Sequence, residues 1–147
     1  MPANDSANDS ANDSANDSAM LADRLAVADV LIAYGSILDE GAWDRLEGCF
    51  TPDAVAVLAG GPKLEGAPAI VAAIREALDS YTATQHHIAG TEVTLDGDRA
   101  QLRANLIATH ITDDGTFEVG GVYREELVRT AEGWQISHHQ LDAVWMH

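Results

Sequence analysis

The chain has 147 residues, with 24 acidic and 8 basic side chains and a formal net charge of −16. One domain of this length can bury a core, whereas so acidic a surface repels nucleic acids and anionic lipids. The sequence shows no apolar run that could cross a membrane and no signal peptide, and the lone Cys49 permits neither an internal disulfide nor a CxxC metal motif. It therefore predicts a cytoplasmic protein that acts on a neutral or cationic small molecule, without nucleic-acid or membrane partners.

The N-terminal segment is repetitive. Residues 3–18 are four copies of Ala-Asn-Asp-Ser. Because this repeat has no apolar face to bury, we predict that residues 1–20 are a disordered tail. The folded domain is then expected to span residues 21–147.

A helical pattern extends from about Ala22 to Leu38, with apolar residues at spacings of three and four. Tyr34 lies on this apolar stripe, and Gly41 is a helix-stop signal. Asp39 falls at the C-terminal end, where the helix dipole disfavours a carboxylate. Asp39 is therefore either solvated or bonded to a partner, for which a histidine is the natural candidate.

A short helix and a strand come next. Trp43, Leu46 and Phe50 have helical spacing, and residues 51–53 turn the chain into a strand over about residues 54–58. A Gly-Gly-Pro turn, a short return strand at residues 63–65 and a third helix with Pro68 in its first turn follow.

The rest of the chain predicts strands. They cover about residues 83–95, 100–111, 116–129 and 134–145, separated by turn signals rich in Asp and Gly. Helices first and antiparallel strands afterwards predict an α+β fold with helices on one face of the sheet, and a meander this long must curl.

The last predicted strand contains a change of phase. Its apolar alternation over residues 134–138 continues in the opposite phase over residues 141–145. A pattern with a period of two changes phase only if a residue is inserted, so we predict a β-bulge near His139 and Gln140. The pair Gly120-Gly121 indicates a similar bend in the preceding strand.

Asp39, the short helix after it and the downstream Thr84-Gln85-His86 together resemble the scytalone dehydratase-like, or SnoaL-like, branch of the nuclear transport factor 2-like superfamily. The resemblance covers about residues 21–145. It implies a cone-shaped roll, in a cystatin-like arrangement, of a strongly curved and mostly antiparallel sheet packed against three N-terminal helices. It also implies an open pocket and a homodimer or other homo-oligomer.

The resemblance pairs Asp39 with His86, and general chemistry shows what such a dyad can do. A carboxylate bonded to one ring nitrogen fixes the imidazole tautomer and raises the basicity of the other nitrogen. That nitrogen can then remove a proton beside a carbonyl group. The alternative is an Asp–His bond with a purely structural role.

Two further residues are candidates for catalysis. Tyr34 stands five residues before Asp39, as a tyrosine does in the bile acid dehydratase of this branch, and it is either a core aromatic or a pocket hydroxyl that polarises a carbonyl. His110 matches a histidine of scytalone dehydratase and is either a proton donor, a hydrogen-bond anchor or a rim residue without a role. Scytalone dehydratase has a tyrosine where this chain has Leu38, which argues against scytalone as the substrate.

Apolar residues of several elements are expected to line the pocket. Strand alternation allows only one histidine of each adjacent pair to face it. A zinc or iron site formed by Asp39, His86 and His110 lacks the ligand spacing of known metal motifs, so we predict neither a metal nor a cofactor. The residues expected to contact the substrate are Trp43, Leu58, Leu106, Ala108 and Val122.

These observations lead to one functional hypothesis and three alternatives. The hypothesis is a cofactor-independent lyase, a dehydratase in which His86 removes a proton next to the carbonyl of a small, largely apolar substrate. An isomerase and an aldol-type cyclase would use the same dyad. A non-catalytic module that binds a small ligand is the third alternative, because fold alone does not determine function.

Overall fold

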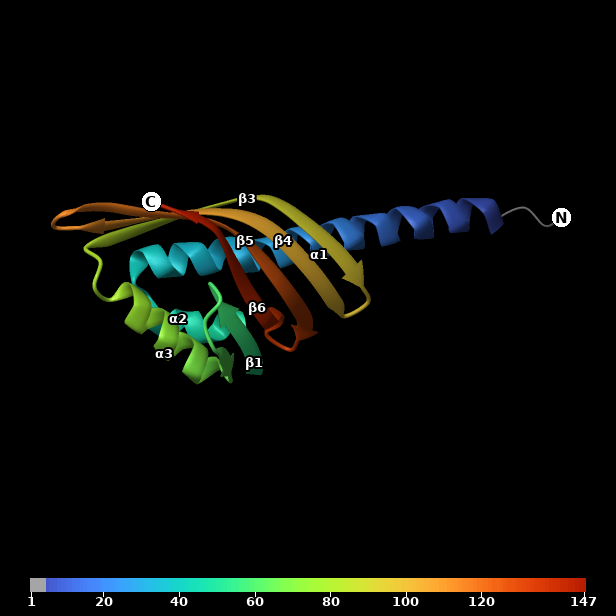
Figure 1. Ribbon diagram of the computed structural model, residues 1–147. Helices are drawn as coiled ribbons and strands as arrows, with labels where there is room; N and C mark the ends of the chain where they lie inside the picture. The colour runs from blue at the N-terminus through green and yellow to red at the C-terminus, as the bar shows by residue number, and fades with distance from the viewer. Residues whose placement is uncertain (1–4) are drawn as a thin grey trace.

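The computed structural model of the protein describes residues 5–147 as three α-helices, one 3₁₀ turn and a six-stranded sheet (Figure 1). The helices are α1 (Asp5–Glu40), α2 (Trp43–Leu46) and α3 (Ala67–Leu78), and η1 (Glu47–Cys49) follows α2. The strands are β1 (Phe50–Leu58), β2 (Lys63–Glu65), β3 (Ala83–Asp96), β4 (Arg99–Thr112), β5 (Gly115–Thr130) and β6 (Gly133–Met146).

The sheet has the order β2-β1-β6-β5-β4-β3, and all pairs are antiparallel except β1 with β6. The helices lie on one side of this curved sheet (Figure 1), and α3 follows β1 and β2 rather than preceding every strand. The predicted α+β class, with helices on one face of a mostly antiparallel sheet, is therefore confirmed.

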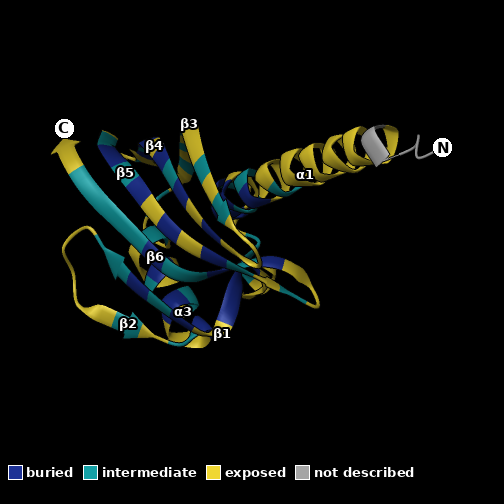
Figure 2. Cartoon of the chain, turned by 90° about the vertical axis from the view of Figure 1, so that its right-hand side faces the viewer, coloured by how far each residue is buried: buried dark blue, intermediate teal, exposed yellow. Residues whose placement is uncertain are grey.

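The core lies between α1, α3 and the inner face of the sheet. Buried and exposed positions alternate along β4 and β5, as strand geometry requires (Figure 2). Helix α1 contributes Val27, Leu31 and Tyr34 to the core, and α3 contributes Ile70 and Ile74, each at most 4% exposed. The apolar spacings read from the sequence thus correspond to the faces that the helices bury.

The start of α1 differs from the predicted disordered tail. Residues 5–20 continue the helix, and all side chains from residue 7 to residue 22 are exposed (Figure 2). The repeat contains neither Gly nor Pro, so it can prolong a helix that tertiary packing nucleates farther along the chain. Residues 1–4 lie outside the described part of the chain.

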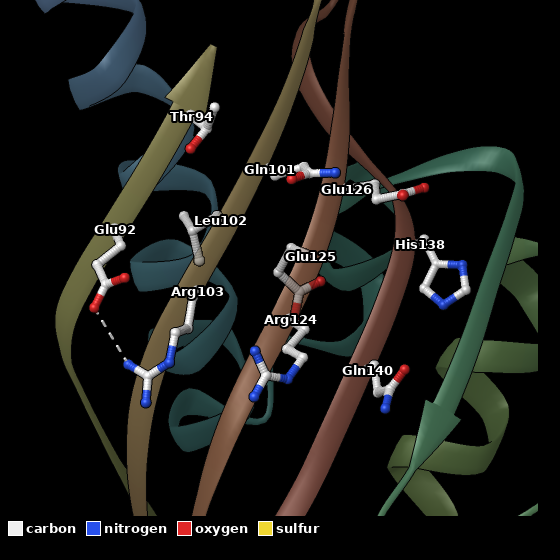
Figure 3. A pocket seen from close by; sticks show the side chains of 10 residues that line it. All are labelled: Glu92, Thr94, Gln101, Leu102, Arg103, Arg124, Glu125, Glu126, His138 and Gln140. Carbon is white, nitrogen blue, oxygen red and sulfur yellow. Dashed lines mark ion pairs between the residues drawn. The ribbon is translucent and has the colours of Figure 1, made fainter. Parts of the chain in front are cut away.

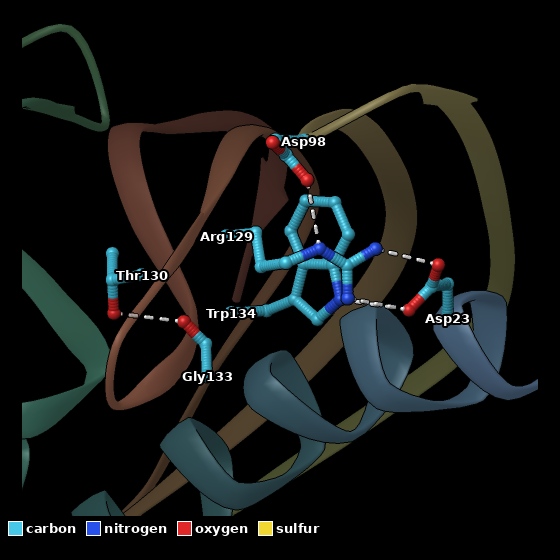
Figure 4. Close-up of polar contacts among 6 residues, drawn as sticks. All are labelled: Asp23, Asp98, Arg129, Thr130, Gly133 and Trp134. Carbon is cyan, nitrogen blue, oxygen red and sulfur yellow. Dashed lines mark hydrogen bonds and ion pairs between the residues drawn. The ribbon is translucent and has the colours of Figure 1, made fainter.

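Helix α1 is anchored to the sheet through Arg129 of β5. Its guanidinium donates to both carboxylate oxygens of Asp23, at 2.9 and 2.6 Å, and through Nε to Asp98, at 2.9 Å (Figure 4). The same guanidinium lies 4.6 Å from the ring centroid of Trp134 (Figure 4). This cluster holds α1 at the end of the sheet that carries the β3–β4 and β5–β6 turns, because a bidentate pair restrains direction as well as distance.

Two register shifts occur between β5 and β6. Ser137 is an extra residue between the pairs formed by Glu126 and Leu127, and Val144 is an extra residue opposite Gly120-Gly121. The predicted phase change is thus present, but its bulge lies at Ser137 rather than near His139-Gln140. A register shift does occur at Gly120-Gly121, although its inserted residue is on β6 and not on β5. Because Ser137 is the inserted residue, His139 faces the interior.

The described helices include no segment that is both long and apolar enough to span a membrane. Cys49 is 8% exposed and packs in the core, and burial raises the pKa of its thiol to about 11. This placement agrees with its position on the apolar pattern of the sequence.

Candidate active site

The end of α1 and the start of β3 meet at the pair Asp39 and His86. Nδ1 of His86 lies 2.6 Å from Oδ1 of Asp39, and the backbone N–H of His86 donates to Oδ2 at 2.8 Å. The hydroxyl of Thr84 donates to Oδ1 at 3.0 Å. Since a carboxylate only accepts, Nδ1 carries a ring proton, and in the neutral ring Nε2 is then unprotonated, the form that a base requires.

The local sequence explains this meeting. Thr84 and His86 are two residues apart on a strand, so both face Asp39, while Gln85 and His87 are exposed. Gly35, one turn before Asp39, lets α1 approach β3 closely, since a Cβ there would lie 2.9 Å from Cδ1 of Ile88. His86 is 5% and Asp39 23% exposed at the side chain, so the dyad is shielded without being sealed.

A cavity of about 330 Å³ adjoins His86, with walls that are mainly apolar. A volume of this order suits a small ligand. The lining residues are Tyr34, Leu38, Leu58, Ala59, Ile74, Ala77, Leu78, His86, Leu106, Ala108, His110, Phe117, Val119, Tyr123, Leu141 and Met146.

The cavity contains three of the five predicted contact residues, Leu58, Leu106 and Ala108. Trp43 instead lines a shallow depression between α2 and α3, where it is partly buried against the core. Val122 lies on the opposite face of β5, because its neighbour Tyr123 is the residue that points inward. Trp43 and Val122 therefore do not line this cavity, and their contact with a substrate stays a prediction.

His110 reaches the cavity from β4. Its Nδ1 lies 3.2 Å from the carbonyl of Phe117, which can only accept, so this nitrogen carries the proton and Nε2 is an acceptor. Burial lowers the pKa of His110, and the nearby His86 lowers it further, against the opposing effects of the Phe117 carbonyl and Asp39. The ring centroids of His86 and His110 lie 6.1 Å apart.

Tyr34 also lines the cavity, and its hydroxyl leads to a second dyad that the sequence analysis missed. The hydroxyl lies 3.2 Å from Nε2 of His139, whose Nδ1 lies 2.8 Å from both carboxylate oxygens of Glu125. A signal for Glu125 was present, because it shares the inward phase of β5 with Tyr123 and Leu127. His139 could not be assigned to the inner face from the sequence, because that assignment depends on which residue of β6 is inserted.

A second depression lies on the outer face of the sheet, lined mainly by polar residues of β3–β6 (Figure 3). Arg103 pairs there with Glu92 at 3.6 Å, and Arg124 pairs with Asp142 at 3.1 Å. Such exposed pairs contribute little and are screened by solvent. His138 lies in this depression while His139 is buried, which confirms that the two neighbours face opposite sides of the sheet.

The side chains in the inner cavity can perform acid–base chemistry on an apolar ligand. Four of them are polar, namely Tyr34, His86, His110 and Tyr123. Within residues 5–147, no three His, Cys, Asp or Glu side chains are grouped as metal ligands would be. The arrangement therefore offers one oriented base, a second imidazole that accepts a hydrogen bond, and two hydroxyl groups within largely apolar walls.

The fold and the site define an α+β protein with an Asp–His dyad beside a mainly apolar cavity. The chain belongs to the SnoaL-like domain family, which matches residues 19–140. The predicted family and its nuclear transport factor 2-like, cystatin-like fold are thereby confirmed.

Several known proteins are similar to this chain. The uncharacterized protein Rv2910c of Mycobacterium tuberculosis is 29% identical over 120 residues, which cover 79% of this chain and 82% of that protein. A proposed aromatic ring hydroxylase from Novosphingobium aromaticivorans is 29% identical, with a TM-score of 0.80 over 86% of this chain and 93% of the other.

Two more distant structures share the fold. A proposed scytalone dehydratase from Novosphingobium aromaticivorans is 18% identical, with a TM-score of 0.80 and coverage of 86% of this chain and 87% of the other. A hexachlorocyclohexane dehydrochlorinase, LinA type 2, is also 18% identical, with a TM-score of 0.81 and coverage of 89% and 91%. Identities this low establish a common fold and leave the reaction to be argued from the site.

Proposed function

We propose that the protein is a cofactor-independent lyase that removes water from a small, largely apolar hydroxy carbonyl compound. The observation that carries this proposal is the 2.6 Å contact between Nδ1 of His86 and Asp39, beside a mainly apolar cavity. An imidazole held in this tautomer has its free nitrogen available as a general base.

The elimination then has a complete proton balance. Nε2 of His86 takes the proton from the carbon next to the carbonyl, and the electron pair forms an enolate. The enolate collapses to a carbon–carbon double bond as the carbon–oxygen bond of the hydroxyl group breaks. Protonated His86 returns its proton to the departing hydroxide, so water leaves and His86 is neutral again.

The structure favours His86 over His110 as the source of that proton. The sequence allowed either histidine to protonate the leaving group. His110 is neutral at ordinary pH because burial lowers its pKa, and its one ring proton is directed to Phe117. A hydrogen bond from the substrate to Nε2 of His110 would orient the substrate without transferring a proton.

Replacement of the base tests the proposal. His86→Ala should reduce turnover of a β-hydroxy ketone by about 10²–10⁴-fold, the contribution of a positioned general base. His87→Ala is the matched control, because the adjacent side chain is exposed on the other face and should leave turnover unchanged. Equal turnover of His86→Ala and the wild type, with both folded by circular dichroism, would refute the proposal.

A second candidate function uses the same dyad without a separate acid. Isomerisation of a double bond next to a carbonyl, or aldol-type cyclisation, also begins with proton removal by His86, and the neutral state of His110 is compatible with a single base that shuttles the proton. Reactions in heavy water distinguish these cases. Deuterium incorporation without loss of water indicates isomerase or cyclase chemistry, and neither exchange nor turnover indicates a binding module.

A further inference from the structure

A second His–carboxylate pair lies beneath the cavity and takes no part in the proposed elimination. Glu125 of β5 and His139 of β6 both have fully buried side chains. Taking a carboxylate and an imidazole out of water is unfavourable unless their hydrogen bonds are satisfied inside the protein. Nδ1 of His139 contacts Glu125 within the pair, and Nε2 of His139 contacts the hydroxyl of Tyr34.

The direction of each hydrogen bond follows from the donors that are present. Nδ1 of His139 is 2.8 Å from both oxygens of Glu125, the symmetric contact that one N–H makes with a carboxylate. Burial raises the pKa of Glu125, and the ring of His139 opposes that rise by its charge and its hydrogen bond. Nε2 is then a lone pair, so at 3.2 Å it accepts the hydroxyl proton of Tyr34. Because a tyrosine hydroxyl has one proton, its oxygen can only accept further bonds, either from the neighbouring hydroxyl of Tyr123 or from a ligand in the cavity.

The packing keeps Tyr34 in this position. Its ring meets Phe50 and Tyr123 edge-on, with centroids 6.1 and 5.9 Å apart, and the ring of His139 stacks on Tyr123 at 5.4 Å. Tyr34 is 2% exposed, and burial raises its pKa, as do the neighbouring Tyr123 and Glu125. The hydroxyl therefore stays protonated, and its ring has no room to turn away from His139.

We propose that Glu125 and His139 are positioning residues that make the Tyr34 hydroxyl a hydrogen-bond acceptor towards the cavity, so that the site takes ligands with a hydroxyl group at this point. The inference rests on the proposed function for the identity of the cavity as the substrate site. It changes the role expected from the sequence, in which Tyr34 donates to a carbonyl.

The test compares a hydroxyl with a carbonyl on one skeleton. The probes are the two-ring alcohol tetralol and the corresponding ketone tetralone, and the readout is the ratio of their dissociation constants. The double variant Glu125→Leu/His139→Phe removes the acceptor of the Tyr34 proton without leaving an unpaired buried charge. The freed proton should shift the ratio in favour of tetralone by about tenfold to a hundredfold, the effect of one buried hydrogen-bond mismatch.

Two further measurements make the outcome decisive. The wild type should bind tetralol more tightly than tetralone. Tyr34→Phe, which keeps the Glu125–His139 pair, should abolish this preference. Nitrogen NMR of His139 in the wild type should show a protonated Nδ1 and an unprotonated Nε2, a readout that does not depend on any variant folding.

The inference is overturned by a proton on Nε2, by an unchanged ratio in a folded double variant, or by failure of both probes to bind. Its failure is distinguishable from that of the proposed function. Selective binding without turnover in any hydroxy ketone assay would contradict the lyase proposal and leave the assignment of Tyr34 intact. Turnover that depends on His86, together with a ratio of dissociation constants that the double variant leaves unchanged, would support the lyase proposal and contradict the assignment of Tyr34.

Discussion

At the scale of single residues, the partner of each histidine decides what the imidazole can do. His86 faces a carboxylate, His110 faces a backbone carbonyl, and His139 faces a fully buried carboxylate. In all three, Nδ1 donates a hydrogen bond to that partner, so in the neutral ring the lone pair is on Nε2. Of the three, His86 and His110 line the cavity, whereas Nε2 of His139 contacts the hydroxyl of Tyr34.

His110 should make stability depend on pH. Its pKa in the folded protein lies below its ordinary value of 6.5, so the unfolded chain takes up a proton first as the pH falls. The stabilisation is therefore present above about pH 6.5 and is lost progressively as the pH falls towards the lowered pKa. The other titratable groups that contact the ring region are His86, Asp39 and Tyr81.

Urea unfolding at pH 7.5 and pH 5.5 measures this effect. The loss of unfolding free energy between the two pH values should be smaller in His110→Phe than in the wild type, while His87→Ala, which changes an exposed histidine, should lose as much as the wild type. An equal loss in all three proteins would show that His110 is not the titrating group.

At the scale of elements, uninterrupted strands were predictable and the interrupted one was not. In β4 a regular alternation brings Leu106, Ala108 and His110 to the cavity. In β6 the sequence revealed that a residue is inserted but not which one, since His138 and His139 are chemically identical candidates for the inward position. The parallel pairing of β1 with β6 joins segments far apart in sequence, which no local pattern specifies.

The bend of β3 depends on Gly90. The register with β4 shifts between Ala89 and Glu92, and Gly90 has φ of 63° within this bulge. An L-residue with a side chain is strained in that region, so Gly90→Ala should lower the free energy of unfolding by about 1 kcal/mol. The bend follows directly after the segment that carries Thr84 and His86, so Kd for cavity ligands should also rise.

Gly48→Ala is the control for this change, because Gly48 has open space around its Cα and its φ is not positive. Its unfolding free energy should stay within a few tenths of a kcal/mol of the wild type. If both substitutions had the same small effect in urea titrations, the bulge would not require glycine.

At the scale of the whole molecule, α1 is attached to the sheet by polar contacts at two places. Asp23 binds Arg129 of β5, and Asp39 binds His86 of β3. Between these points the helix buries its apolar face, which sets the position of Asp39 relative to the cavity. The N-terminal part of α1, blue in Figure 1, projects beyond the sheet, and the family match begins at residue 19.

Two N-terminal deletions should therefore behave differently. Deletion of residues 1–20 removes only exposed side chains among the described residues 7–20, so the melting temperature and the affinity for cavity ligands should not change. Deletion of residues 1–24 also removes Asp23 and Arg24, which bond to Arg129 and to the carbonyl of Val93 at 2.7 Å.

The longer deletion should lower the melting temperature by several degrees, since it leaves Arg129 without its bidentate partner and removes the attachment of the N-terminal part of α1 to the sheet. Differential scanning calorimetry measures both values under one condition. Hydrogen exchange adds an independent readout, because a helical segment without tertiary contacts should exchange its amides far faster than residues 27–38. A lower melting temperature for the shorter deletion would mean that the repeat contributes to the fold, and equal values for the two deletions would mean that the Asp23–Arg129 anchor does not.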